Sequence, residues 1–172
     1  MLPLLALGLT ISLSGCGKKE APAADHAAHA AAPAEAAPAA AATAANEAVV
    51  IEANDQMKFN VTKVEAKAGS SITLTLKNVG KLPKTAMGHN LVVLKQSANA
   101  TQFATAAMGA AASEYIPANM ADQVIAHTKL LGPGESDSIT FTVPSEPGEY
   151  VFLCSFPAHF MAGMKGLLVV TE

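Results

Sequence analysis

Residues 149–170 read Glu149-Tyr-Val-Phe-Leu-Cys154-Ser-Phe-Pro-Ala-His159-Phe-Met-Ala-Gly-Met164-Lys-Gly-Leu-Leu-Val-Val170. They contain two apolar stretches joined by a loop rich in metal-binding side chains. Residues 149–154 and 166–170 predict two strands, so the loop between them closes a hairpin. Within eleven residues this loop carries a thiol, an imidazole and two thioethers. The spacing is typical of a metal site built on a hairpin loop.

A second imidazole lies far upstream, in Met87-Gly88-His89-Asn90. One cysteine and two histidines with a weak methionine are the donor set that soft, redox-active copper prefers. Catalytic zinc more typically takes three firm nitrogen, oxygen or sulfur ligands and keeps an open position for water. The donor set therefore predicts copper.

Apolar residues alternate with polar ones along much of the remaining chain, as in Ser71-Ile-Thr-Leu-Thr-Leu76 and Ser138-Ile-Thr-Phe-Thr-Val143. This period predicts half-buried strands. Further short strands, rich in branched or aromatic residues, are expected at 49–51, 59–64, 90–94 and 150–153. Strands at this spacing favour an all-β sandwich of two sheets. One helix is expected over residues 98–112, as a flap packed against the sandwich.

The composition changes sharply near Glu47, so the 172 residues are not expected to form one globular unit. Residues 48–172 are long enough for one domain with its own core. The formal charge of −3 argues against nucleic acid binding. The two cysteines, Cys16 and Cys154, lie in regions of different character, so no disulfide is expected between them.

Residues 2–13 form an apolar run that ends in Leu13-Ser14-Gly15-Cys16. The run has the length of a signal-peptide hydrophobic region and is too short for a membrane-spanning helix of about 20 residues. Its ending resembles a bacterial lipobox, which predicts a signal peptide over 1–15 and a lipidated Cys16. The usual basic start is missing, and a cleaved signal with an incidental cysteine is the alternative. Gly17 stands where an inner-membrane retention signal usually has Asp, which favours the outer membrane.

Residues 16–47 are expected to form the lipidated cysteine and a flexible linker. Over residues 21–48, 18 of 28 residues are alanine, so the segment buries too little surface to offset its ordering entropy. Prolines interrupt any helix there: Pro22, Pro33 and Pro38. His26 and His29 suggest a second copper site, but two histidines on a disordered linker more often have no function.

Within residues 48–172, runs in the same order resemble azurin, the blue copper protein of the cupredoxin fold. These runs are Asn54-Asp55-Gln56-Met57, Leu82-Pro83-Lys84, Met87-Gly88-His89-Asn90, Val124-Ile125-Ala126-His127-Thr128-Lys129 and Cys154-Ser155-Phe156-Pro157. The similarity covers nearly the whole domain and implies a cupredoxin-like Greek-key sandwich. With the lipobox and the Ala/Pro-rich linker, the chain resembles the lipid-modified azurins of Gram-negative bacteria.

The resemblance implies one copper ion that cycles between Cu(I) and Cu(II). Its equatorial ligands would be His89, Cys154 and His159, and the backbone carbonyl of Gly88 would be a very weak axial contact. The resemblance also implies that the backbone N–H groups of Asn90 and Phe156 point at the Cys154 sulfur. Ser155 would tie the two ligand loops together through the Asn90 side chain.

The axial thioether departs from azurin, because four residues rather than three separate His159 from Met164. This longer gap resembles auracyanin and rusticyanin. Met164 is the expected axial ligand, since Gly163 lets the loop turn before the last strand. Met161 is the alternative, but it lies only two residues past His159, so its side chain should point away from the metal.

Three other features bear on the resemblance. The azurin disulfide near the start of the domain has no counterpart, because Val49 or its neighbours and Ser70 or Ser71 occupy the region. Asn78 replaces a histidine that flanks the azurin site, so any pH dependence attached to that histidine should be absent. His127 carries over as a surface histidine distant from copper, more often solvated than functional.

The resemblance further implies an apolar patch around the protruding edge of the copper-bound histidine. A flat apolar surface allows close approach to a partner cofactor and rapid release. The residues at the matching positions are Met57, Leu82, Ala86, Met87, Met108, Phe156, Pro157 and Ala158. The alternative is that these are half-buried rim residues at one end of the sandwich.

These observations predict a type 1 copper protein that carries single electrons and is not an enzyme. The expected partners, by resemblance, are redox proteins such as cytochrome c, nitrite reductase, an oxidase or a peroxidase. The expected location is the periplasmic side of the envelope, on a lipid anchor, with the protein a monomer. One alternative is a protein that sequesters or delivers copper. A Cys/His hydrolase is another, but no orienting acid or oxyanion arrangement accompanies Cys154 and His159.

Overall fold

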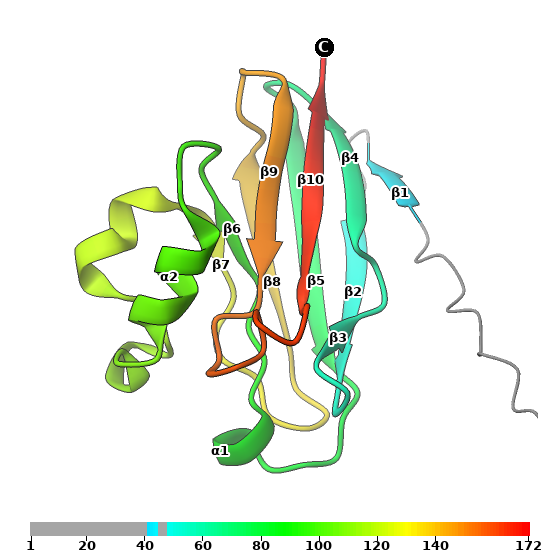
Figure 1. Cartoon of the computed structure of the whole chain (residues 1–172). Helices are drawn as coiled ribbons and strands as arrows, with labels where there is room; N and C mark the ends of the chain where they lie inside the picture. Colours follow the sequence, from blue (N-terminus) through cyan, green and yellow to red (C-terminus); the bar gives the residue numbers. More distant parts are fainter. Residues whose placement is uncertain (1–40, 45–47) are drawn as a thin grey trace, which may run out of the picture. The chain divides into compact units, whose positions relative to one another are not determined.

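The computed structural model describes residues 41–44 and 48–172, and in this part of the chain two β-sheets form a sandwich (Figure 1). The strands are β1 (Ala41–Ala44), β2 (Ala48–Asn54), β3 (Lys58–Phe59), β4 (Lys63–Lys67), β5 (Ser71–Asn78), β6 (Val92–Leu94), β7 (Val124–His127), β8 (Ser136–Thr142), β9 (Gly148–Leu153) and β10 (Lys165–Thr171). The helical segments are α1 (Lys84–Met87), α2 (Ala100–Ala107), η1 (Ala111–Ser113) and η2 (Ala118–Gln123).

One sheet has the strand order β1-β4-β10-β9-β6-β7 and the other the order β3-β2-β5-β8. Antiparallel pairs join β9 to β10, β5 to β8 and β6 to both β7 and β9, whereas β2 pairs with β5, and β4 with β10, in parallel. Neighbours in a sheet are thus often distant in sequence, because the chain crosses repeatedly between the sheets. The predicted all-β sandwich is confirmed.

The period-two alternation has a direct structural cause on β5. Ile72, Leu74 and Leu76 are buried in the core between the sheets, and the intervening threonines face outward. On the outer face Thr73 and Thr140 hydroxyls lie 2.8 Å apart. Cross-strand hydroxyl pairs of this kind fix the register of neighbouring strands.

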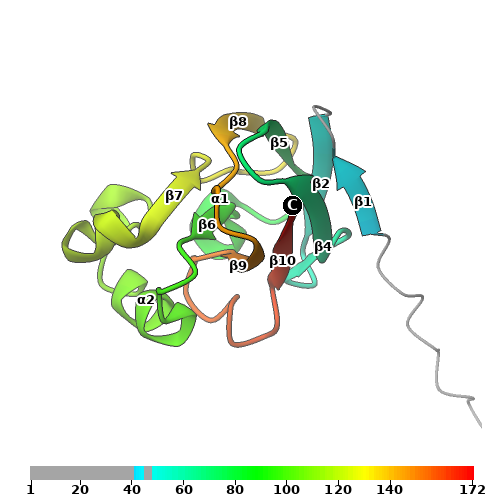
Figure 2. The same ribbon diagram turned by 90° about the horizontal axis from the view of Figure 1, so that it is seen from above.

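Strand β6 lacks alternation because both of its faces are covered. Val93 joins the main core, whereas Val92 and Leu94 pack in a second cluster with Phe103 of α2 and with Leu153. Figure 2 shows α2 beside β6 and β9, away from the four-stranded sheet. The expected flap is therefore present, and it converts the outer face of β6 and β9 into core.

The flap helix is shorter than the predicted span of residues 98–112. Asn99 caps its first turn, with its Oδ1 accepting a 3.0 Å hydrogen bond from the Gln102 N–H. The helix ends at Ala107, two residues before Gly109, and the following residues form turns and η1. The alanine-rich composition predicted helix over the whole span, but the turns and η1 instead lead the chain toward η2 and the edge strand β7.

The strand predicted over residues 59–64 is divided between the sheets, since Phe59 ends β3 and Lys63 begins β4. At the crossing, the Asn60 Oδ1 accepts a 2.7 Å hydrogen bond from the Glu52 N–H. Strand β7 and helix α1 were not predicted, because neither has a clear period: β7 is partly buried on both faces and α1 has four residues.

Strand β1 (Ala41–Ala44) lies inside the range predicted to be linker and pairs in parallel with β4. The predicted lipidation site Cys16 and the histidines His26 and His29 lie outside the described residues. Within the described part of the chain, no helix has the length and apolar character needed to span a bilayer.

Candidate metal centre

Three side chains from two distant loops converge at one end of the sandwich. His89 lies between α1 and β6, Cys154 follows the last residue of β9, and His159 lies on the loop between β9 and β10. All three are buried, with exposed fractions of 0%, 0% and 2%. The Cys154 Sγ lies 4.0 Å from the His89 Nδ1 and 3.4 Å from the His159 Nδ1.

The hairpin loop holds its own shape by backbone hydrogen bonds. The Met164 carbonyl accepts a 3.1 Å bond from the Cys154 N–H, and the Met164 N–H donates to the His159 carbonyl at 3.0 Å. Ala158 and Gly163 turn the chain with φ of 69° and 93°. These contacts bring His159 back over Cys154 although five residues separate them in sequence.

His89 is fixed from the opposite side. Its N–H donates to the Leu131 carbonyl at 3.1 Å, and its carbonyl accepts from the Leu131 N–H at 2.7 Å. Gly88 precedes it in a tight space, since a Cβ there would lie 2.7 Å from the Lys84 carbonyl oxygen and 3.1 Å from Leu130 methyl carbons. A larger residue at 88 would therefore displace the backbone next to His89.

The Asn90 side chain joins the two loops. Its Oδ1 accepts a 2.8 Å hydrogen bond from the Ser155 N–H, and its Nδ2 donates to the Ser155 Oγ at 2.8 Å. Both side chains are buried, with exposed fractions of 0% and 1%. The network fixes the spacing between the residue after His89 and the residue after Cys154.

Burial controls the protonation of all three donor groups. It raises the pKa of the Cys154 thiol to about 12, while backbone hydrogen bonds from Asn90 and Phe156 act in the lowering direction. Burial, and then the neighbouring His89, lowers the pKa of His159 to about 4. Burial also lowers the pKa of His89. Both imidazoles are thus neutral at pH 7, as metal ligands must be.

The geometry fits a single metal ion. Bonds of about 2.1 Å to Nδ1 and about 2.3 Å to Sγ, at about 120°, would place the two atoms about 3.8 Å apart. The observed separations of 4.0 and 3.4 Å lie on either side of this value. With Nδ1 directed at the sulfur, the buried Nε2 of His89 has no hydrogen bond of good geometry within the described chain, although the Asn54 backbone lies close enough to raise the pKa of the ring.

The two candidate thioethers have opposite environments. Met164 is fully buried in the main core cluster together with Cys154, whereas Met161 is 74% exposed. The Met161 thioether is directed into solvent, so it cannot also reach a metal ion bound at the buried Cys154 sulfur. The arrangement therefore favours Met164 as the weak fourth donor.

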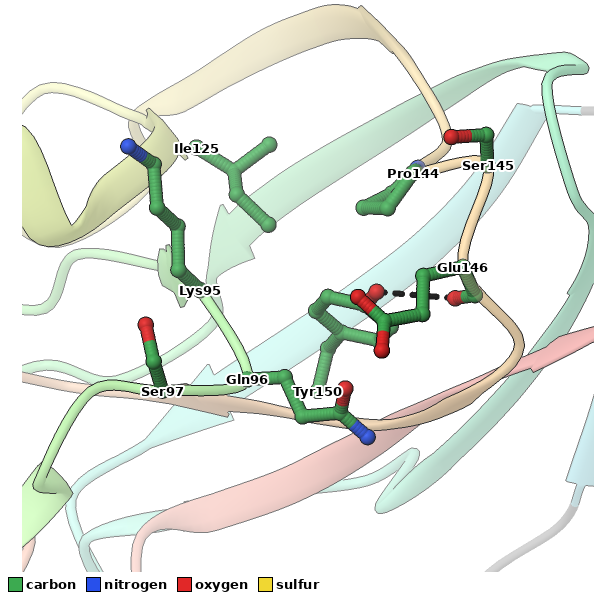
Figure 3. A pocket seen from close by; sticks show the side chains of 8 residues that line it. All are labelled: Lys95, Gln96, Ser97, Ile125, Pro144, Ser145, Glu146 and Tyr150. Atoms are coloured by element: carbon green, nitrogen blue, oxygen red, sulfur yellow. Dashed lines mark hydrogen bonds between the residues drawn. The ribbon is translucent and has the colours of Figure 1, made fainter.

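One surface cavity lies well away from these donor groups. It has a volume of 570 Å³ and opens at the far end of β9, between the segments that carry Lys95, Ser145 and Tyr150 (Figure 3). A smaller hollow of 270 Å³ lies beside the metal loop, lined by Met108, Phe156 and Met161 among others. Cavity size alone would have pointed away from the metal centre.

Residues 45–171 match the family model described as copper binding proteins, plastocyanin/azurin family. The chain belongs to this family. Azurin-2 of Alcaligenes xylosoxydans xylosoxydans is 48% identical over 122 residues, which cover 69% of this chain and 92% of that protein. Outer membrane protein H.8 of Neisseria meningitidis serogroup B is 45% identical over 117 residues, covering 66% and 62%. Dithionite-reduced auracyanin from Roseiflexus castenholzii has a TM-score of 0.66 and 35% identity, covering 73% of this chain and 97% of its own.

Family membership and the His/Cys/His group together make this chain a type 1 blue copper electron-transfer protein with the cupredoxin fold and one copper ion. Members of the plastocyanin/azurin family carry electrons and are not catalytic enzymes. The expected resemblance to azurin is confirmed. The longer gap between His159 and Met164 was predicted to resemble auracyanin. An auracyanin is among the structural matches.

Several predicted patch residues are accessible near the metal loop. Leu82 is 44% exposed and Met108 55% exposed. Ala86 and Ala158 are also exposed, Met57, Met87 and Pro157 are half-buried, and Phe156 is buried beneath them. Phe156 packs on His159, with ring centroids 4.7 Å apart.

Two neighbouring contacts were not predicted from the sequence. The Asn90 Nδ2 also donates to the Glu114 carbonyl at 3.0 Å, and the Tyr115 ring packs edge-on against Phe156 at 4.9 Å. Glu114 and Tyr115 belong to no recognisable motif, so no local pattern could reveal them. Asn78 is buried and donates from Nδ2 to the Leu131 carbonyl at 3.2 Å. Among the described residues the free cysteine is Cys154.

Proposed function

We propose that His89, Cys154 and His159 are the three strong copper ligands and that Met164 is the weak axial ligand, with the Gly88 carbonyl as a still weaker contact. The observation that carries this assignment is the convergence of three buried donor atoms, all within 4.8 Å of one another. Three strong ligands with a long methionine contact suit both Cu(I) and Cu(II).

Bound there, copper supplies a one-electron couple between Cu(II) and Cu(I). The protein's part is to keep the donors in place while the charge changes. The Cys154–Met164 and His159–Met164 backbone bonds, and the Asn90–Ser155 pair, hold the loops without the metal. The backbone hydrogen bonds from Asn90 and Phe156 withdraw charge from the sulfur and so contribute to the reduction potential.

The partner surface of the proposed function is the apolar patch around His159, which is 2% exposed and covered by the loop residues beside it. The patch comprises Met57, Leu82, Ala86, Met87, Met108, Pro157 and Ala158. Its partners would be redox proteins such as a cytochrome c, a nitrite reductase, an oxidase or a peroxidase. The protein acts as a monomeric carrier and not as an enzyme.

The remaining part of the proposal concerns the N-terminal region. Residues 1–15 would be a lipoprotein signal peptide, and residues 16–47 the lipidated Cys16 and a linker to the domain over 48–172. The anchor would hold the domain on the periplasmic side of the envelope, at the outer membrane. The similarity to a Neisseria protein named as an outer membrane protein supports this placement, as does the Leu13-Ser14-Gly15-Cys16 ending of the apolar run.

Copper loading tests the ligands, and stopped-flow mixing tests the electron carrier. We expect an intense absorption band at about 600 nm, from charge transfer between copper and thiolate. Mixing the copper-loaded protein with a reduced c-type cytochrome should bleach this band rapidly. A protein that only stored or delivered copper would oxidise the cytochrome hardly at all, and that result would contradict the electron-carrier role.

A matched pair of surface variants tests the partner patch. Leu82→Lys places a charge inside the patch, and Val50→Lys places the same charge on a similarly exposed residue of β2, at 44% and 43% exposure. The bimolecular rate with the cytochrome should fall several-fold in the first variant alone. Equal rates in the two variants would mean that the partner binds elsewhere.

Intact-mass spectrometry of protein extracted from membranes tests the anchor. Material that begins at Cys16 and carries acyl chains is expected, and Cys16→Ser should leave the protein in the soluble fraction. A membrane-bound Cys16→Ser variant would argue against lipidation at this residue.

A further inference from the structure

Two consecutive residues after the flap helix, Glu114 and Tyr115, have left-handed backbone conformations with φ of 54° and 65°. Residues other than glycine adopt this conformation at an energetic cost, and a neighbouring pair persists only where the surrounding structure enforces it. Here the Tyr115 N–H donates to the Ala110 carbonyl at 2.9 Å. We refer to Glu114 and Tyr115 as the flap turn.

The backbone of the flap turn determines how the Asn90 side chain is oriented. The Asn90 Nδ2 donates to the Glu114 carbonyl at 3.0 Å and to the Ser155 Oγ at 2.8 Å, while its Oδ1 accepts from the Ser155 N–H at 2.8 Å. Because both donor and acceptor ends of this buried amide are used, one orientation satisfies all of its partners. Moving the Glu114 carbonyl would leave a buried N–H unpaired.

The Glu114 carboxylate connects the flap turn to the segment that pairs with His89. Its Oε2 accepts a 3.2 Å hydrogen bond from the Leu130 N–H, and the next residue, Leu131, pairs with His89 through two backbone bonds. The Lys84 ammonium lies 4.0 Å from the Glu114 Oε1, at the surface. Glu114 thus contacts the segments on both sides of the His89 backbone.

The ring of Tyr115 contacts the other ligand loop. It packs edge-on against Phe156 at 4.9 Å and 64°, and Phe156 packs against His159 at 4.7 Å. The backbone N–H of Phe156 also donates a hydrogen bond to the Cys154 sulfur. Removing the Tyr115 ring would therefore free Phe156 to move and would admit water toward both Cys154 and His159.

We propose that Glu114 and Tyr115 are positioning residues that hold the two ligand loops together and keep water out, and thereby raise the reduction potential. This inference rests on the proposed ligand set. The oxidised site carries one more positive charge than the reduced site, and water stabilises the more highly charged form. Excluding water therefore favours Cu(I).

The first test uses metal-free protein and amide hydrogen exchange. In Tyr115→Ala the Ser155 amide should exchange at least tenfold faster than in the unaltered protein, while amides of β5 and β8 in the other sheet keep their rates. Tyr115→Phe retains the ring, so its Ser155 amide should be protected as before. A Ser155 amide in Tyr115→Ala that exchanges within twofold of the unaltered protein would overturn the proposal. If Tyr115→Ala does not fold, Tyr115→Leu carries the same comparison.

The second test measures the reduction potential of copper-loaded variants by voltammetry. Tyr115→Ala should shift the equilibrium threefold or more toward Cu(II), which corresponds to about 28 mV for a one-electron couple. Tyr115→Phe should restore the original value, and Tyr150→Phe, at the far end of β9, should not change it. A potential in Tyr115→Ala equal to that of Tyr150→Phe would refute the tuning role.

The two tests separate this inference from the ligand assignment. If the unaltered protein fails to give the blue band, the proposed ligands are wrong, and the exchange test still decides whether the flap turn holds the loops. If the blue band is present and both Tyr115→Ala results match the unaltered protein, only the flap turn proposal fails.

Discussion

The two ends of strand β9 differ in a way that pocket geometry does not reveal. At its start, near Tyr150, lies the 570 Å³ groove, whose polar groups are exposed or paired, such as the Tyr150 hydroxyl that donates to the Glu146 carbonyl at 2.8 Å. At its other end lies Cys154, which is fully buried. The polar side chains buried in the described chain are Asn78, His89, Asn90, Thr128, Ser155 and His159.

All six buried polar side chains lie in or beside the loops at the Cys154 end. Burying polar groups costs free energy unless they are hydrogen-bonded or bind a ligand. Four of the six, Asn78, Asn90, Thr128 and Ser155, are hydrogen-bonded, whereas the buried His89 Nε2 has no hydrogen-bond partner in the described chain. This buried imidazole marks the proposed copper site more reliably than a hollow does. The groove at the other end is a surface feature of a well-packed domain.

The largest expected contrast between the two ends comes from Cys154→Ser. The hydroxyl cannot replace the thiolate, so the blue band should disappear completely, whereas Tyr150→Phe at the far end should keep it. Copper at about 1,000 times its dissociation constant should stabilise the unaltered fold by about 4 kcal/mol, and should not stabilise Cys154→Ser to that extent. Absorption spectra and thermal unfolding with and without copper measure both effects. If the Cys154→Ser protein stayed blue, Cys154 would not be the copper ligand, and the contrast between the two ends of β9 would fail.

Gly88→Ala tests how tightly the copper end is packed. The added Cβ would lie 2.7 Å from the Lys84 carbonyl oxygen, so the backbone must shift, at a cost of about 1–3 kcal/mol in the free energy of unfolding. Gly109→Ala is the control, because its Cβ would be 3.7 Å from the nearest atom, the Ala106 carbonyl oxygen. Denaturant unfolding of both variants gives the comparison, and equal stabilities would show that the Gly88 backbone moves freely.

Met164→Leu sharpens the assignment of the fourth donor. The substitution nearly conserves volume, so stability should change by less than about 1.5 kcal/mol. Loss of the thioether should shift the equilibrium about tenfold toward Cu(I), or about 59 mV. Met161→Leu, at an exposed position, should leave the potential unchanged. The opposite pattern in voltammetry would assign the axial contact to Met161.

Tyr150→Phe should have the smallest effect, and it concerns stability alone. Loss of the hydrogen bond to the Glu146 carbonyl should cost about 1 kcal/mol. Burial and the Glu146 carboxylate raise the pKa of Tyr150 above 10.0. Its contribution to stability is therefore complete below the pKa of the unfolded chain and is lost as pH rises through the folded pKa. Above pH 10 the unaltered protein should lose stability more steeply than Tyr150→Phe, as unfolding curves at several pH values would show.

Local patterns in the sequence predicted most of the sandwich. The alternation in β5 and β8 follows directly from a strand with one face in the core and one in solvent. Strand β7 was not predicted, because it is partly buried on both faces and so shows no alternation. The division of residues 59–64 into two strands was not predicted either. The sheet that each half joins is decided by its pairing partner, which is β2 for β3 and β10 for β4.

The sequence by itself determined the donor types. Cys154, His159 and Met164 lie close together on one loop, and His89 lies in Met87-Gly88-His89-Asn90, a run that resembles azurin. Only the tertiary structure brought His89 to within 4.0 Å of the sulfur and buried Met164 while leaving Met161 exposed. It alone placed Glu114 and Tyr115 against both ligand loops. The physical reason is that side-chain chemistry is a property of each residue, whereas distance and burial depend on the packing of segments that are remote in the chain.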